Sequence, residues 1–221
     1  MKNLIAKELK LSVGISSIIY LIIGILVEFA PNYPKYIPCL FICIGLFMIF
    51  KTGSVNKDLL YTACLPVRKS DTVKARVIIF AFSEVLQLIL CIPLIFISKE
   101  LKLTNNAGID LNFAFIGLAF TFYAVFNFVF LTSFYKKGGK EGGAYLKSMI
   151  ILFIYMIILE IPVFLVKTEL PFAKIGRLMD STEYSDMIKQ LPFVAAGLII
   201  WIVGLFITCK VCIKKFEKID L

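Results

Sequence analysis

Two carboxylates that lie inside long apolar stretches, Glu84 and Glu160, are the residues of this chain with the most distinctive chemistry. An ionised carboxylate in the middle of a bilayer costs about 2.5 to 3.5 kcal/mol, so such a residue usually faces protein or water and has a function. A buried carboxyl group can instead stay neutral and form a hydrogen bond between helices. Both interpretations stay open for Glu160, whereas the structural one is favoured for Glu84, Gln87 and Asn127.

The residue types that are absent restrict the chemistry further. The chain has no histidine, which excludes His-based zinc sites, Ser-His-Asp and Cys-His catalysis, and haem held by histidine. Most of its six cysteines fall in apolar runs, where a free thiol behaves as a small hydrophobe. Cys209 and Cys212 form a CxxC, but no second pair completes a four-ligand metal site, so packing is favoured over metal binding or palmitoylation. We therefore expect no catalytic residues and no metal site.

The elements that must position these residues are membrane-spanning helices. Apolar residues make up 60% of the chain, against about 45 to 50% in soluble domains. Residues 111–135 carry no Asp, Glu, Lys or Arg, and as a helix they would reach roughly 37 Å, longer than the ~30 Å hydrocarbon core. The sequence predicts an all-α polytopic membrane protein, a single domain over residues 1–221. Its six predicted spans are 11–27, 36–50 with an extension towards 55, 77–98, 111–135, 148–166 and 191–209.

The distribution of Lys and Arg predicts the orientation of these spans. With the amino terminus in the cytoplasm, 17 of the 24 basic residues lie in cytoplasmic segments and 7 lie outside. Positive residues concentrate in cytoplasmic loops, so both termini are predicted to be cytoplasmic. The same bias explains the net charge of +9 through contact with anionic lipid headgroups, and we expect no nucleic-acid partner.

Two segments outside the spans are predicted to be helical. Residues 1–10 interleave Leu and Ile with charged residues, which fits an amphipathic helix at the cytoplasmic interface or a plain basic anchor. Residues 167–190 lie outside the cell, where Ser181 is placed to cap a helix that continues with apolar residues at helical spacing. This segment resembles a pair of short extracellular helices, with a surface cap as the alternative.

The cytoplasmic loop 51–76 carries the most specific signal. Leu59, Leu60, Ala63 and Cys64 share one face of a short helix, which Pro66 must end at or before residue 65. A second helix is then expected to begin with Ser70 as its N-cap and to run directly into the third span. This arrangement would project from the membrane as a rigid knob, although six basic residues could also make it a simple cytoplasmic loop.

Residues 65–73, Leu-Pro-Val-Arg-Lys-Ser-Asp-Thr-Val, resemble the Leu-Pro-Val-Ser-Arg-Lys-Asp-Ile-Val segment of small six-span permeases of ABC type-2 exporters. In that family this loop is the coupling helix that docks into an ATPase subunit. The resemblance therefore implies a cytoplasmic coupling helix between spans two and three. The positions that it assigns to coupling are Leu59, Leu60, Tyr61, Leu65, Pro66, Val67, Arg68, Lys69 and Asp71.

The same resemblance implies the partners and the task of the chain. There is no GxxxxGK[ST] phosphate loop, so ATP and magnesium are expected on a separate ATPase subunit, and this chain needs no cofactor of its own. A second permease copy, identical or related, would complete the path. Glu160, Glu84 and Asn127 are then the candidate residues of a translocation path. The expected cargo is an amphipathic peptide, antibiotic or lipid-like compound that leaves the cell through a bacterial cell membrane.

The alternative is a membrane protein without a transport role, such as a bacteriocin-immunity scaffold or an intramembrane enzyme. An enzyme would need a nucleophile with a base, or paired acids. Without histidine, the candidates reduce to Glu84, Glu160 and scattered Ser and Thr, with no recognisable motif.

Overall fold

The computed structural model describes residues 2–11, 15–28, 30, 34–101, 108–136, 140–167 and 172–219. Within these residues the regular structure is entirely helical. In chain order the elements are α1 (Lys2–Leu11), α2 (Ile15–Glu28), α3 (Tyr36–Val55), α4 (Asp58–Ala63), α5 (Lys69–Glu100), α6 (Phe113–Lys136), α7 (Glu141–Phe164), the 3-10 helix η1 (Leu165–Lys167), α8 (Phe172–Asp180) and α9 (Tyr184–Glu217).

Five helices, α3, α5, α6, α7 and α9, are long and apolar enough to cross a bilayer. They coincide with the second to sixth predicted spans, and α3 extends to Val55, as the short uncharged run 36–50 required. The first predicted span corresponds to α2, which has 14 residues and reaches only about 21 Å. The axes of α1 and α2 differ by 82°, and only the two together would count as a sixth span. The prediction of an all-α fold with several spans is therefore confirmed, and the number of spans is five or six.

The centre of the bundle is α6, which packs most extensively against α9. Two glycines allow this approach, because a Cβ on Gly197 would collide with the backbone carbonyl of Gly117 and a Cβ on Gly117 would collide with the backbone of Phe193. Farther along the pair, Gly204 lies against Ala124. The small residues of α9 are thus used within the chain, where they let two helix backbones touch.

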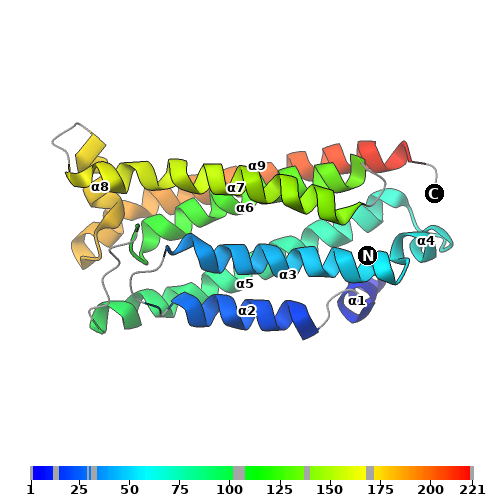
Figure 1. Ribbon diagram of the computed structural model, residues 1–221, viewed down its shortest axis with the longest axis horizontal. Coiled ribbons are helices and arrows are strands. Elements are labelled where there is room, and N and C mark those ends of the chain that lie inside the picture. The colour runs from blue at the N-terminus through cyan, green and yellow to red at the C-terminus, as the bar shows by residue number, and fades with distance from the viewer. Residues whose placement is uncertain are drawn as a thin grey trace.

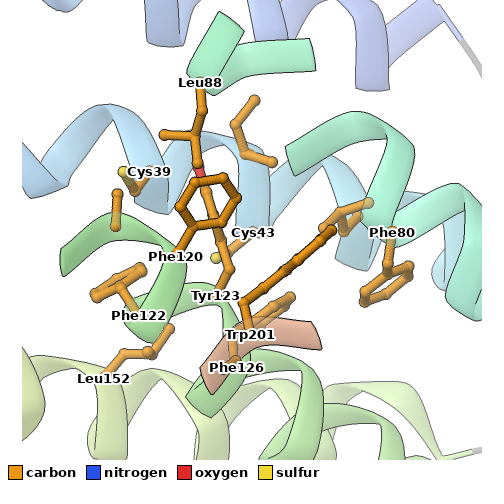
Figure 2. Packing of buried hydrophobic residues seen from close by; sticks show 14 of the residues in the cluster. Cys39, Cys43, Phe80, Leu88, Phe120, Phe122, Tyr123, Phe126, Leu152 and Trp201 are labelled. Carbon is orange, nitrogen blue, oxygen red and sulfur yellow. The ribbon is translucent and has the colours of Figure 1, made fainter. Parts of the chain in front are cut away.

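The interior between the helices is filled largely by aromatic rings. Phe50 packs edge-on against Phe80, Phe130 and Phe134, with ring centroids 4.5 to 5.5 Å apart. Figure 2 shows part of this core, in which Trp201 of α9 packs against Phe120 of α6 with ring centroids 5.4 Å apart. A core of this kind buries a large apolar area per residue and leaves little freedom to the rotamers.

The bundle has two distinct ends (Figure 1). The helix α4, the start of α1 and the end of α9 lie together at one end, which we call the α4 end. The helix α8 and the residues that lead into α6 lie at the opposite end, which we call the α8 end. Both described ends of the chain are therefore on the same side as α4. This agrees with the even number of crossings that the sequence predicts.

Two predicted helix caps are wrong. The helix α5 begins at Lys69 with Arg68 as its N-cap, so Ser70 lies one residue inside the helix. The helix α9 begins at Tyr184 with Glu183 as its N-cap, and the Ser181 hydroxyl instead donates to Asp186. The segment 167–190 also differs from the expected pair of short helices, because its second half forms the first turns of α9.

Candidate functional site

The helix α4 is held away from the bundle by two sharp turns. At its start, Lys57 has φ 52° and ψ 35°, a left-handed conformation that reverses the chain after α3. After its end at Ala63, Pro66 prevents the helix from continuing, and Arg68 is extended with ψ 137° before α5 begins. The predicted short helix, proline break and helical restart are therefore confirmed. Asp71 lies in the first turn of α5.

Beneath α4 lies a group of four charged side chains, the half-buried Lys7 and the buried Glu8, Asp58 and Arg76, which we call the charge cluster. Lys7 Nζ is 2.5 Å from Asp58 Oδ1 and 3.3 Å from Glu8 Oε1. Arg76 Nη2 is 2.6 Å from Asp58 Oδ2, and its Nε is 3.4 Å from Glu8 Oε2. The cluster thus joins α1, α4 and the first turns of α5, three elements that are separate in the sequence.

The charges of the cluster balance, with two cations facing two carboxylates. Burial alone would raise the pKa of Asp58, but hydrogen bonds and charges from Lys7 and Arg76 outweigh it and hold this pKa below its usual value. A buried ion pair adds little net stability compared with an apolar pair, whereas removing one partner is strongly destabilising. The cluster is therefore best understood as a device that fixes the position of α4.

Two aromatic rings and a glycine also lie close to Arg76. The guanidinium carbon is 4.9 Å from the ring centre of Phe50 and 6.0 Å from that of Phe134. Such cation–π contacts are worth up to about 2 kcal/mol when the cation is desolvated. Gly53 at the end of α3 lies against both Asp58 and Arg76. Arg76 therefore attaches the loop to the aromatic core as well as to α1 and α4.

Lys69 connects the same region to the end of α9. Its Nζ donates to the carbonyl oxygen of Ile219 at 2.6 Å and lies 5.8 Å from the ring centre of Phe216. The resemblance assigned Lys69 to a partner contact, but here its side chain is engaged within the chain. The end of α9 is therefore part of the support beneath α4.

The remaining coupling positions differ in exposure. The exposed ones, together with the exposed Cys64, form what we call the α4 surface, which comprises Leu60, Tyr61, Cys64, Pro66 and Arg68. Leu60 is 50% exposed and Tyr61 is 56% exposed. Leu65, Val67 and Asp71 are half-buried, and the side chain of Leu59 lies outside the described residues. A rigid base thus presents a leucine and a tyrosine outward beside a basic residue, a combination that suits protein binding.

Glu84 and Asn127, two of the three predicted path residues, contact each other in the centre of the bundle. Glu84 Oε2 accepts a hydrogen bond from Asn127 Nδ2 at 3.0 Å and another from Trp201 Nε1 at 2.7 Å. One turn farther along α5, Gln87 Oε1 accepts from the Tyr123 hydroxyl. Glu84 and Asn127 are fully buried, so in this packing they connect α5, α6 and α9.

Glu160 lies apart from that pair, at the α8 end of α7. Its Oε2 accepts from the backbone N–H of Ile109 at 3.0 Å. Gly108 has φ 154°, and a Cβ there would collide with the Glu160 carboxylate, so the close approach requires glycine. Glu160 is 6% exposed and holds the segment that leads into α6. The three predicted path residues therefore do not form one site in this packing.

A hydrogen-bonded junction surrounds this segment at the α8 end. Asn112 caps α6 through its Oδ1, which accepts from Phe115 N at 2.9 Å, and its Nδ2 donates to Met179 O at 2.6 Å. Gln190 donates to the carbonyls of Leu178 and Ser181 and accepts from Ala114 N. The start of α6, the end of α8 and the start of α9 are thereby joined.

Sequence reasoning missed most members of the charge cluster and the role of Trp201. The available signals were compositional: Glu8 and Asp58 are acidic residues within basic segments, and Trp201 is the only tryptophan of the sequence. None of these signals identifies the contacting partner.

The comparisons with known proteins give no further information on the site. No protein-family model, curated protein sequence or solved structure matches this chain. Among the described residues, no group of three or more His, Cys, Asp or Glu side chains is arranged to hold a metal ion.

Proposed function

We propose that the chain is the membrane subunit of an ATP-driven exporter and that its α4 surface docks onto a separate ATPase. The observation that carries this proposal is the construction of α4. A short helix with exposed Leu60 and Tyr61 stands at the end of the bundle, and the charge cluster ties it to α1 and α5. A surface that receives force from a partner needs both features, an accessible contact and a stiff connection to the spans.

The orientation follows from the Lys and Arg count. The predicted cytoplasmic segments carry 17 of the 24 basic residues, so the positive-inside rule favours a cytoplasmic position for these segments and for the α4 end. ATP is cytoplasmic, so the α4 surface would be on the side where the ATPase binds. A bacterial cell membrane is the proposed location.

Force applied to α4 would pass to the bundle by two routes. Asp58 transmits it to α1 through Lys7, and to α5 through Arg76. Closure of two ATPase subunits around ATP and magnesium would then shift α5 and its neighbours between two packings, the usual form of such transitions. The path for an amphipathic cargo would lie between this chain and a second copy, and Glu160 would line it only after leaving Ile109.

Two exposed tyrosines at opposite ends of the bundle allow a direct test. Tyr61 on α4 is 56% exposed and Tyr184 at the α8 end is 54% exposed. We would co-express the chain with the ATPase encoded nearest to it in its genome and measure how much ATPase co-purifies in detergent. Tyr61→Ala combined with Leu60→Ala should reduce recovery at least tenfold, because interface energy concentrates in a few aromatic and apolar contacts.

The matched control is Tyr184→Ala, which removes an equally exposed ring at the other end and should leave recovery unchanged. Both variants should reach the membrane in wild-type amounts. Equal ATPase recovery with wild type and the Leu60/Tyr61 double variant would remove the docking role of α4 and, with it, the exporter proposal.

A further inference from the structure

The centre of the bundle holds a carboxylate that has no cationic partner in the part of the chain that the structure describes. Glu84 lies in the middle of α5 and is 0% exposed. Its hydrogen-bond partners are two neutral donors, the amide of Asn127 on α6 and the indole of Trp201 on α9. Among the described residues, no Lys or Arg forms an ion pair with it.

The atoms that remain unpaired form a specific pattern. Glu84 uses Oε2 for both of its hydrogen bonds, which leaves Oε1 buried without a partner. Asn127 uses Nδ2, which leaves its Oδ1 buried without a partner. Both leftover atoms are acceptors, and they belong to the two side chains that are already joined by one hydrogen bond. If Glu84 is ionised, each of them costs the desolvation energy of an unsatisfied polar group.

A single proton removes both defects. A carboxylic acid and a primary amide are complementary, because the amide N–H donates to one acid oxygen while the acid O–H donates to the amide oxygen. The first of these hydrogen bonds is present, from Asn127 Nδ2 to Glu84 Oε2. A proton on Glu84 Oε1 would supply the second to Asn127 Oδ1. Trp201 would still donate to Oε2.

The other titratable groups around Glu84 cannot neutralise a negative charge on its carboxylate. The titratable groups that interact with it electrostatically are Cys39 and Cys43 on α3 and Tyr123 on α6. Thiols and phenols can only be neutral or negative, so they favour the uncharged form of Glu84. With α5 spanning a bilayer, the surrounding medium disfavours an ionised carboxylate as well.

We propose that Glu84 is a proton-binding site, at which a carboxylic acid pairs with the Asn127 amide and accepts from Trp201. A bound alkali cation, which would take several oxygen ligands, is the alternative that the stability test below separates from a bound proton. The site holds α5 to the pair α6 and α9. A rearrangement that opens this contact to water would release the proton.

Infrared spectroscopy of the purified wild-type protein tests the protonation state directly. The difference spectrum between wild type and Glu84→Gln should contain the C=O band of a neutral carboxylic acid at neutral pH, and this band should shift in D2O. Glu160→Gln serves as the matched control and should leave the Glu84 band in place. A difference spectrum that contains carboxylate bands instead would overturn the proposal.

Thermal stability supplies a second test that does not depend on the spectra. Glutamine reproduces the neutral acid, since its amide can donate to Asn127 and accept from both Asn127 and Trp201. The melting temperature of Glu84→Gln should therefore be close to that of wild type. As the pH is raised, the melting temperature of Glu84→Gln should increase relative to that of wild type. Glu84→Ala should have a lower melting temperature than wild type at every pH. If Glu84→Gln is destabilised as much as Glu84→Ala, or if sodium or potassium stabilises wild type selectively, the proton site is wrong.

Discussion

The charge cluster at the α4 end and the Glu84 site in the centre deal with buried carboxylates in opposite ways. In the charge cluster, Asp58 and Glu8 each face a cation, and the charges cancel within a few ångströms. At the Glu84 site, two neutral donors face the carboxylate and no cation is present among the described residues. In the first arrangement, buried carboxylates stay ionised because cations pair with them. In the second, the buried carboxyl group stays neutral because it holds a proton.

The difference follows the position along α5. Arg76 lies two turns from the start of the helix, near the predicted cytoplasmic interface, whereas Glu84 lies about 12 Å farther along. Near the interface, the long side chains of Lys7 and Arg76 can carry charge into the protein at moderate cost. Near the middle of the bilayer that cost is highest. For these two sites, the pairing of the buried carboxylates thus follows their depth along α5.

Removing the arginine should produce the largest effect. Arg76→Ala leaves Glu8 and Asp58 buried with only Lys7, and we expect a loss of about 3 to 5 kcal/mol in the free energy of unfolding. Unfolding in mixed micelles by increasing detergent denaturant would measure it. Lys74→Ala removes an exposed cation two residues away, whose pair with Asp71 is worth about 0.5 kcal/mol or less. Similar losses for both variants would show that the cluster is ordinary surface charge.

Acid should weaken the charge cluster by a smaller amount. The folded-state pKa of Asp58 lies below its ordinary value of 3.8, so its contribution to stability is complete above that value. As the pH falls below 3.8, the unfolded state takes up the proton first and this contribution is progressively lost. We expect the free energy of unfolding of wild type to fall faster over this pH range than that of Asp58→Asn. The variant is less stable than wild type at neutral pH, and it has no carboxyl group at position 58 to take up a proton. Parallel pH profiles would contradict the ion pairing of Asp58.

The smallest effect is expected at the Glu84 site. Trp201→Phe keeps the ring that packs on Phe120, with centroids 5.4 Å apart, but removes the indole N–H. Hydrogen bonds between membrane helices are worth about 0.6 kcal/mol on average and at most about 1.7 kcal/mol, which bounds the loss. A double-mutant cycle should couple Trp201 to Glu84 and leave Trp201 uncoupled from Arg76. Coupling to Arg76 would show that the two regions are not independent.

The sequence predicts the local features of this fold well. The hydrophobic runs locate α3, α5, α6, α7 and α9, since a long apolar stretch needs no knowledge of its neighbours. Pro66 likewise ends the helix before it wherever that helix packs. By contrast, Ser70 and Ser181 fail as caps because helix starts depend on neighbouring turns. Arg68 is the extended N-cap residue, so α5 begins at Lys69, two residues earlier than it would with Ser70 as the N-cap.

The contacts that build the candidate sites depend on packing between distant segments. Lys7, Asp58 and Arg76 come from three elements, and Glu84 meets Trp201 across 117 positions of the chain. A single sequence contains the residue types but not these pairings. The continuity of α9 through Pro192 is a similar case, because neighbouring helices let a membrane helix tolerate a proline that would otherwise end it.

The glycine contact between α6 and α9 has a mechanical consequence. Backbone touches backbone where Gly117 meets Gly197, so sliding one helix past the other would drive side chains into peptide groups. We therefore expect α6 and α9 to move as one rigid pair during any conformational change. Relative displacement is then left to the contact between this pair and α5, which the hydrogen bonds of Glu84 and Gln87 cross.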